Sequence, residues 1–137
     1  MSEFINTIDL LGDDVVGGAI VDGSITEIKD DILTTIRGYA LRECSSLTTI
    51  DFPNVTSINS GSFYGCSNLK TVILRSNVLC TLNNTNSFTN TPIASGTGYV
   101  YVPRNLVDTY KTDSTWKTYA NQFRALEDYP EICGGDN

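Results

Sequence analysis

The sequence predicts an α/β solenoid of about three to four stacked coils with helical caps at both ends. Three observations predict it. A unit of 22 residues recurs from Ser24 onward, and in a short stretch of each unit apolar residues alternate with polar ones, as in a β-strand. Beyond Pro103 the apolar residues recur at helical spacing. We therefore expect an N-terminal cap (1–23), a solenoid (24–103), and a C-terminal helical cap with a flexible tail (104–137).

The first 23 residues predict a cover for the open end of the solenoid. Phe4, Ile5, Ile8 and Leu11 share one face of a short amphipathic helix over residues 1–11, and an acidic turn with a partial strand follows over 12–23. A terminal coil exposes its apolar layer, so such a helix is a typical cap. The segment lacks the basic start and long apolar run of a signal peptide, and we expect no export by that route.

The repeat is visible when the chain is aligned with itself. Ser24–Ile28 matches Ser46–Ile50 and then Asn68–Val72, with apolar residues on apolar residues each time. Further matches cover the rest of the unit: Thr34–Ile36 on Thr56–Ile58, Leu41 on Phe63 and Cys44 on Cys66. One unit is too short to bury its own apolar face, so the coils must stack until equivalent residues form ladders.

Each coil is expected to contain a strand, a turn, a second extended piece and a tight helical turn. In the second coil these are Leu47–Phe52, Pro53–Asn54, a piece that ends at Ile58, and a turn that carries Phe63 and Cys66. Leu47 and its equivalent in the next coil should be fully buried.

The third coil departs from the period. Val78–Leu82 comes two residues late relative to Ile58, and the run Asn83–Asn86 lengthens the connection to Phe88. Insertions in a solenoid map to loops. Tyr99–Val102 is then expected to form the fourth and last strand of the ladder.

Two helices are predicted after Pro103. Leu106, Val107 and Tyr110 would share one face of the first helix, with Asn105 as its cap. The second would begin near Asp113 or Ser114, and its apolar face would contain Trp116, Tyr119, Ala120, Phe123 and Leu126. Aromatic residues at this spacing typically cover a terminal coil and do not by themselves indicate a cofactor site.

The pattern of the second coil resembles the BspA-like leucine-rich repeats of bacterial, protozoan and phage proteins. The matching stretches are Ser-Leu-Thr-Thr-Ile-Asp-Phe-Pro (46–53), Val-Thr-Ser-Ile (55–58) and Ser-Phe-Tyr-Gly-Cys-Ser-Asn-Leu (62–69). Gly98–Pro103 with the following aromatics also looks like the end of short members that are encoded in prophages of gut bacteria. The resemblance implies a surface-exposed recognition scaffold, sometimes carried on a virion, without enzymatic activity.

The residues themselves offer little to catalysis. The chain has no histidine, which removes the commonest general base and any Ser-His or Cys-His pair. Gly96-Thr97-Gly98 precedes a strand and has no lysine, unlike a phosphate-binding loop. The net charge of −7 disfavours nucleic acid and anionic membranes as partners. We predict no enzymatic activity and no cofactor.

Cysteines and acidic pairs likewise indicate no metal. Cys44 and Cys66 are equivalent residues, expected to be buried and reduced, and the spacing of the four cysteines does not match a zinc site. We expect Cys133 to be exposed and reactive. Asp13–Asp14 and Asp30–Asp31 lack the ligand spacing of a calcium loop and are interpreted as solvated turns.

The remaining candidate is the outward face of the strand ladder. Between the core positions lie side chains that should face solvent in adjacent pairs: Glu27 and Lys29, Thr49 and Asp51, Thr71 and Ile73, Tyr99 and Tyr101. The ladder changes from charged to apolar and aromatic, and tyrosine offers a large contact area with few rotors. Either a partner covers that apolar end, or a neighbouring loop of the same chain does. On the first alternative, Tyr101→Ala should weaken assembly or binding.

Three functions fit these observations. The first is a phage-encoded virion or tail-associated protein, located in the virion or in the host cytoplasm before assembly, that self-associates or binds a host surface. The second is a fragment of a bacterial cell-surface adhesin. The third is an acidic intracellular module that binds a basic protein.

Overall fold

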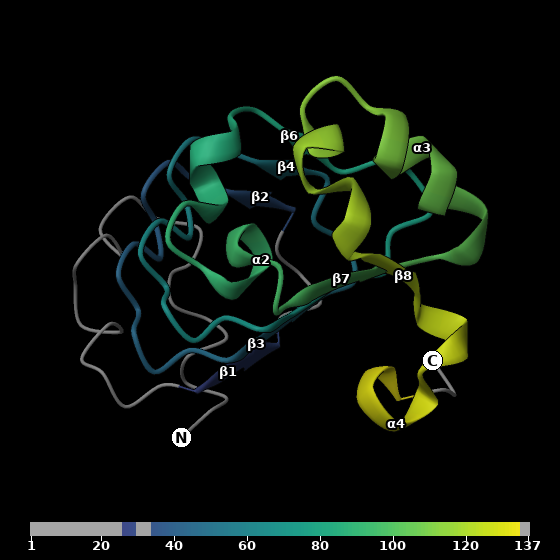
Figure 1. The fold of residues 1–137 in the computed structure, drawn as a ribbon, viewed down its shortest axis with the longest axis horizontal. Helices are drawn as coiled ribbons and strands as arrows, with labels where there is room; N and C mark the ends of the chain where they lie inside the picture. The colour runs from purple at the N-terminus through teal and green to yellow at the C-terminus, as the bar shows by residue number, and fades with distance from the viewer. Residues whose placement is uncertain (1–25, 30–33, 135–137) are drawn as a thin grey trace.

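Two parallel sheets face each other in the structure, and successive coils contribute one strand to each (Figure 1). The structure is a computed structural model that describes residues 26–29 and 34–134. The expected helix over 1–11, the turn and strand over 12–23, and both acidic pairs lie outside the described residues.

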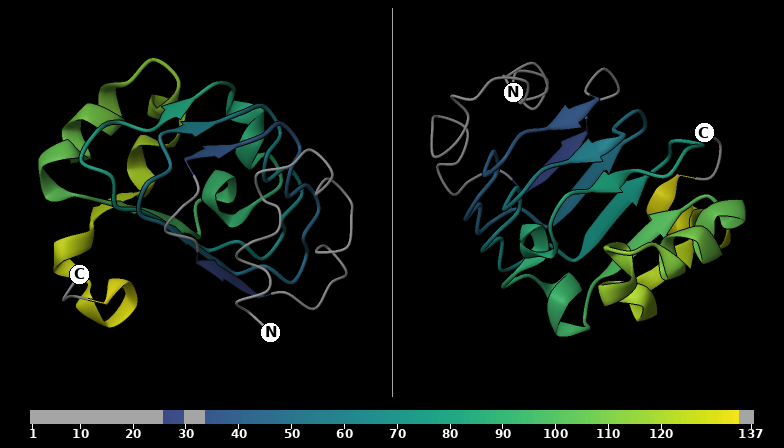
Figure 2. Two further views of the ribbon diagram at one scale, coloured as in Figure 1. Left: turned by 180° about the vertical axis from the view of Figure 1, so that it is seen from behind. Right: turned by 90° about the horizontal axis from the view of Figure 1, so that it is seen from above.

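The larger sheet has five strands in the order β1-β3-β5-β7-β8, and the smaller has three in the order β2-β4-β6. Their bounds are β1 Glu27–Lys29, β2 Thr35–Ile36, β3 Thr49–Phe52, β4 Ser57–Ile58, β5 Thr71–Leu74, β6 Thr81–Leu82, β7 Tyr99–Val102 and β8 Phe123–Ala125. The right-hand view of Figure 2, seen from above, shows strands of successive coils lying side by side. The prediction of an α/β repeat solenoid is confirmed at this level.

The strand register follows the sequence repeat. Ile28 pairs with Ile50 and Ile50 with Val72, at the 22-residue period. In the smaller sheet Ile58 pairs with Leu82, two residues later than that period requires, as the sequence predicted. The two extra residues lie between β5 and β6, in residues 75–80, and the 3-10 helix η2 (Thr85–Phe88) follows β6.

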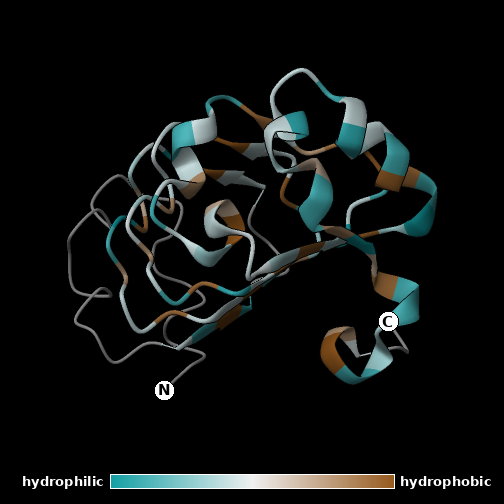
Figure 3. Cartoon of the chain, in the orientation of Figure 1, coloured by the Kyte–Doolittle hydropathy of each residue, from teal (hydrophilic) through white to brown (hydrophobic). Residues whose placement is uncertain are grey.

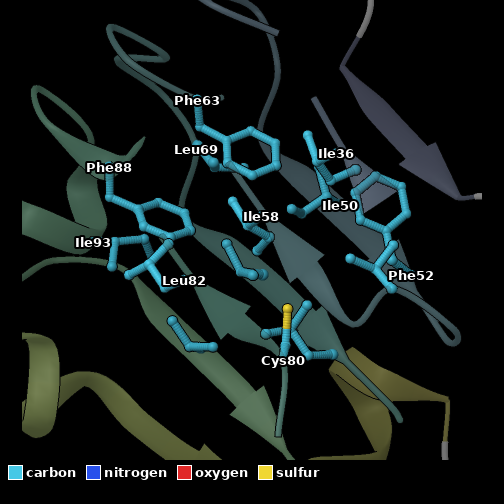
Figure 4. Close-up of a cluster of buried hydrophobic side chains, with 14 of the residues drawn as sticks. Ile36, Ile50, Phe52, Ile58, Phe63, Leu69, Cys80, Leu82, Phe88 and Ile93 are labelled. Carbon is cyan, nitrogen blue, oxygen red and sulfur yellow. The ribbon is translucent and has the colours of Figure 1, made fainter. Parts of the chain in front are cut away.

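The main core fills the space between the two sheets (Figure 4). Alternate strand residues point inward, because successive side chains of a strand face opposite sides. Leu47 and Leu69 are fully buried, as expected, and the ring of Phe63 stacks on that of Phe88 with centroids 5.4 Å apart. The equivalent turns of neighbouring coils are joined by backbone bonds from Leu41 N–H to Ser62 O and from Phe63 N–H to Ser87 O.

One glycine of these turns is required by its surroundings. Gly61 has φ +67°, which disfavours other residues, and a Cβ there would lie 2.2 Å from the ring of Tyr39. The Tyr39 ring therefore packs directly on the backbone of the next coil.

Short helices follow the last coil. They are α2 Pro92–Ser95, η3 Arg104–Leu106, α3 Val107–Thr112, η4 Trp116–Gln122, η5 Leu126–Asp128 and α4 Pro130–Cys133. Asp113 Oδ2 accepts the N–H groups of Thr115 and Trp116, in agreement with a cap near Asp113. Asn105 does not cap the first helix: it lies within η3, and α3 begins two residues later.

The second predicted helix ends early, and the residues that should continue it form a strand. Phe123–Ala125 is β8, which pairs in parallel with β7, so β7 is the fourth strand but not the last. An apolar residue at position 123 suits a helix or a strand that packs on the core, so the sequence did not distinguish these two conformations. The strand conformation also supplies hydrogen-bond partners to the edge of β7, which a helix could not do.

Aromatic side chains from this region cover the last coil. Trp116 lies 5.8 Å from Phe88 between ring centroids, and its Nε1–H donates to Cys80 O at 2.6 Å. The Cys80 N–H donates to the Tyr110 hydroxyl at 2.8 Å. The core of the solenoid thus continues without interruption into the C-terminal region.

Candidate binding surface

The strand register brings the predicted site residues together on the outer face of the larger sheet. They form two rows across it: Glu27, Thr49, Thr71 and Tyr99 in the first row, and Lys29, Asp51, Ile73 and Tyr101 in the second. Parallel strands lie about 4.8 Å apart, so each row is a regular array of side chains.

The first row is at least partly exposed along its whole length. Glu27 is exposed and forms a loose ion pair with Lys29 at 3.7 Å, while Thr49, Thr71 and Tyr99 are partly buried. The guanidinium carbon of Arg124 lies 4.4 Å from the centroid of the Tyr99 ring. Sequence reasoning missed Arg124 because it placed residue 124 in a helix, and the neighbouring Phe123 suits a helix or a strand equally.

The second row is covered over most of its length. Asp51 is 6% exposed, Ile73 1% and Tyr101 4%. The prediction that these three residues face solvent is therefore wrong. The cover is the chain's own C-terminal segment, Leu126–Cys133, and of the two alternatives for the apolar end, packing under a neighbouring part of the chain is the one observed.

The C-terminal segment lies on the opposite side of the larger sheet from the main core (Figure 1). Cys133 packs with Ile73 and Tyr101 in a small apolar cluster of its own, and the rings of Tyr129 and Tyr101 meet edge to face with centroids 5.2 Å apart. Figure 3 shows that α4 combines strongly hydrophobic and hydrophilic residues within one turn. Leu126, Tyr129 and Cys133 of this segment pack on the sheet, whereas Ile132 is exposed.

Arg75 connects the sheet to this segment. Its Nε donates to Asp51 Oδ1 at 2.8 Å and its Nη2 donates to Asp51 Oδ2 at 2.9 Å. The same Nη2 donates to the carbonyl oxygen of Cys133. The buried carboxylate is thus paired, as buried charges must be. Arg75 was also missed, although it follows its strand at the place where the other coils have Pro53 and Pro103.

The cysteines are all buried free thiols, which corrects the expectation for Cys133. Cys133 is 2% exposed, and burial raises its pKa to about 11, so its thiol is neither exposed nor readily ionised. Burial also raises the pKa of Cys80 to about 12. The burial expected for Cys44 and Cys66 is confirmed, and the interaction with Cys66 together with burial raises the pKa of Cys44.

Potential metal ligands do not come together in groups of three or more within residues 26–29 and 34–134. In the same part of the chain, no buried side-chain nitrogen or oxygen is left without a hydrogen-bond partner. None of the helices found there is long and apolar enough to cross a bilayer.

Comparison with known proteins supplies the family. A sequence model described as "BspA type Leucine rich repeat region (6 copies)" matches residues 23–104, more than half of the chain. No curated protein and no solved structure matches the chain. Leucine-rich repeats are typically binding modules without catalytic activity. The chain belongs to the family of BspA-type leucine-rich repeat proteins.

Proposed function

We propose that this chain is a non-enzymatic recognition protein that binds another protein through the outer face of its larger sheet. The part of that face outside the C-terminal segment is called the open surface below; it consists of Glu27, Lys29, Thr49, Thr71, Tyr99 and Arg124. The observation that carries the proposal is the row from Glu27 to Tyr99, which a parallel sheet presents at fixed spacing.

The side chains of the open surface suit recognition. Thr49 and Thr71 are short, so the centre of the row is low and a partner can approach the sheet closely. Tyr99 ends the row with the Arg124 guanidinium over its ring, and tyrosine and arginine are among the residues enriched at the energetic anchors of protein interfaces. The sheet holds all of them on a rigid frame, which reduces the entropy lost on binding.

The charges restrict the partner. The net charge of −7 repels polyanions at long range, whereas the open surface itself carries both signs, at Glu27, Lys29 and Arg124. A protein surface with mixed polarity matches this pattern better than a nucleic acid or an anionic membrane does. Self-association through the same row would be a case of such a protein partner.

Site-specific cross-linking tests this proposal. A photoreactive phenylalanine analogue placed at Thr71 should capture a protein from the natural host, and the same analogue at Thr118, which is exposed on η4, is the matched control. We expect one product at Thr71 that is absent at Thr118. Equal yields at the two positions would contradict a role for the open surface.

The setting of this function is also a proposal. The resemblance of Gly98–Pro103 and the following aromatics to short prophage-encoded repeats supports a virion or tail-associated protein that assembles with itself or binds a host surface. We propose in addition that residues 1–23 cover the first of about three to four coils with a helix. Mass spectrometry of purified particles from an induced lysogen tests the setting: the chain should copurify with the particles, and its recovery only in the soluble host fraction would contradict it.

A further inference from the structure

The contacts of the C-terminal segment, Leu126–Cys133, are those of a bound peptide. Its apolar contacts with Ile73 and Tyr101 form a cluster separate from the main core, on the other side of the larger sheet. Removal of the segment would therefore expose two outward side chains and leave the interior of the solenoid filled.

The segment keeps its shape through its own backbone. The Tyr129 N–H donates to Leu126 O at 3.1 Å, and the Cys133 N–H donates to Tyr129 O at 2.8 Å. Its polar links with the solenoid, in contrast, run through side chains, at Arg75 and Arg104. Such a segment can leave the sheet without breaking a strand pair, which makes local release less costly than unfolding.

Two arginines mark the ends of the covered area. At one end Asp51 holds Arg75 in place, and Arg75 donates to the Cys133 carbonyl. At the other end Arg104 binds an acidic pair: its backbone N–H donates to Glu127 Oε1 at 2.8 Å, and its guanidinium lies 2.6 Å from Asp128 Oδ1. The area covered by the segment thus consists of the apolar side chains of Ile73 and Tyr101 between two arginines, in a chain whose net charge is −7.

We propose that this area is a peptide-docking site, that the C-terminal segment occupies it in cis, and that an acidic peptide of a protein partner takes the segment's place. The cis contacts define the peptide. It carries two acidic residues for Arg104, an aromatic residue that meets Tyr101 as Tyr129 does, and a turn that brings a small apolar side chain onto Ile73 and a carbonyl to Arg75. The inference rests on the proposed function, because it assigns a partner to the covered half of the same face.

The C-terminal segment belongs to the same chain as its docking site, and this determines how tightly a free peptide is expected to bind. A tethered segment competes at an effective concentration in the millimolar range, so a free peptide binds the intact protein weakly and binds well only when the segment is loosened. Two full-length variants loosen it. Cys133→Glu places a charge among the apolar side chains of Ile73 and Tyr101. Glu127→Lys with Asp128→Arg sets like charges against Arg104 at two exposed positions.

The test uses a fluorescent peptide with the sequence of residues 126–134, kept reduced and measured by anisotropy. We expect it to bind both loosened variants at least about tenfold more tightly than the unmodified chain. Adding Arg75→Gln should abolish the gain, and a scrambled peptide should not bind. Circular dichroism and thermal unfolding identify which variants are folded. Absence of binding to a folded loosened variant, or binding that persists after Arg75→Gln, would overturn the proposal.

Sedimentation of the same samples separates a partner peptide from a second copy of the chain. We expect monomers that bind the peptide. A stable dimer that excludes the peptide would assign the site to exchanged C-terminal segments and overturn the proposal as stated. The peptide-binding test does not involve Thr71, which the cross-linking test uses. Failure of the peptide test can therefore be distinguished from failure of the proposed function of the open surface.

Discussion

Arg75 and Asp51, from neighbouring coils, form two hydrogen bonds of 2.8 and 2.9 Å on the outer side of the larger sheet. Their side chains are only 16% and 9% exposed, because the C-terminal segment covers them. The pair positions the guanidinium that donates to Cys133 O, so Arg75 joins two coils to α4.

Replacement of Asp51 by Asn should weaken this junction. Arg75 would keep its position but lose its counter-charge in a covered site, and we expect a loss of about 1–3 kcal/mol in unfolding free energy. Glu27→Gln is the matched control, because Glu27 and Lys29 form an exposed pair whose loss costs at most about 1 kcal/mol. Urea denaturation of both variants measures the difference, and equal losses would contradict the role given to the covered pair.

Leu69→Ala tests the stacked core. Leu69 is fully buried between the sheets, so truncation should leave a cavity and lower the unfolding free energy by about 2–5 kcal/mol. Val78→Ala serves as control, since Val78 is 56% exposed and its change should stay within about 0.5 kcal/mol. If Leu69→Ala lowers the unfolding free energy no more than Val78→Ala does, the coils do not share one core.

Tyr110→Phe tests the junction between the last coil and the C-terminal helices. The hydroxyl accepts the buried Cys80 N–H at 2.8 Å, and its removal should leave that donor unpaired at a cost of about 1–3 kcal/mol. Tyr39 is partly exposed, so Tyr39→Phe should have little effect. Chemical denaturation compares the two, and indistinguishable midpoints would refute the hydrogen bond's importance.

Alkaline pH should destabilise the protein through its buried thiols. The pKa of Cys133 rises from 9.0 to about 11 on folding, so above pH 9 the unfolded chain has lost a proton that the folded chain keeps. Stability is therefore fully present below pH 9 and falls as the pH approaches 11. The loss for one thiol is at most about 1.4 kcal/mol per pH unit.

Cys133→Ala isolates that contribution. The variant should show a shallower decline of unfolding free energy between pH 9 and pH 11 than the unmodified chain, while the Cys80 contribution persists in both. Denaturant titrations at several pH values measure the slopes. Parallel declines in the two proteins would show that the Cys133 thiol is not buried in solution.

The sequence predicted the parts of the fold that depend on the repeat. The pairing of Ile28, Ile50 and Val72, and the two-residue delay at Leu82, follow from the period alone. It did not predict β8, because Phe123 suits a helix or a strand equally and the choice depends on the edge of β7.

The sequence predicted which residues of the candidate site lie beside one another on neighbouring strands. It did not predict which of them are exposed to solvent. The rows that contain Thr71 and Tyr101 are aligned as expected. That Tyr101 is covered depends on Arg75 and the C-terminal segment, which are joined by a contact across 58 residues that no local pattern specifies. Tyr101→Ala should therefore lower stability, in place of the weaker assembly expected from the sequence.

The affinity of the protein captured at Thr71 tests the central claim most directly. Thr71→Glu places a long charged side chain in the middle of the open surface, and Thr118→Glu places the same group on η4. Isothermal titration calorimetry with the captured partner should give a dissociation constant at least about tenfold higher for Thr71→Glu, which is about 1.4 kcal/mol, and an unchanged constant for Thr118→Glu. Unchanged affinity in a folded Thr71→Glu variant would contradict recognition through the outer face of the larger sheet.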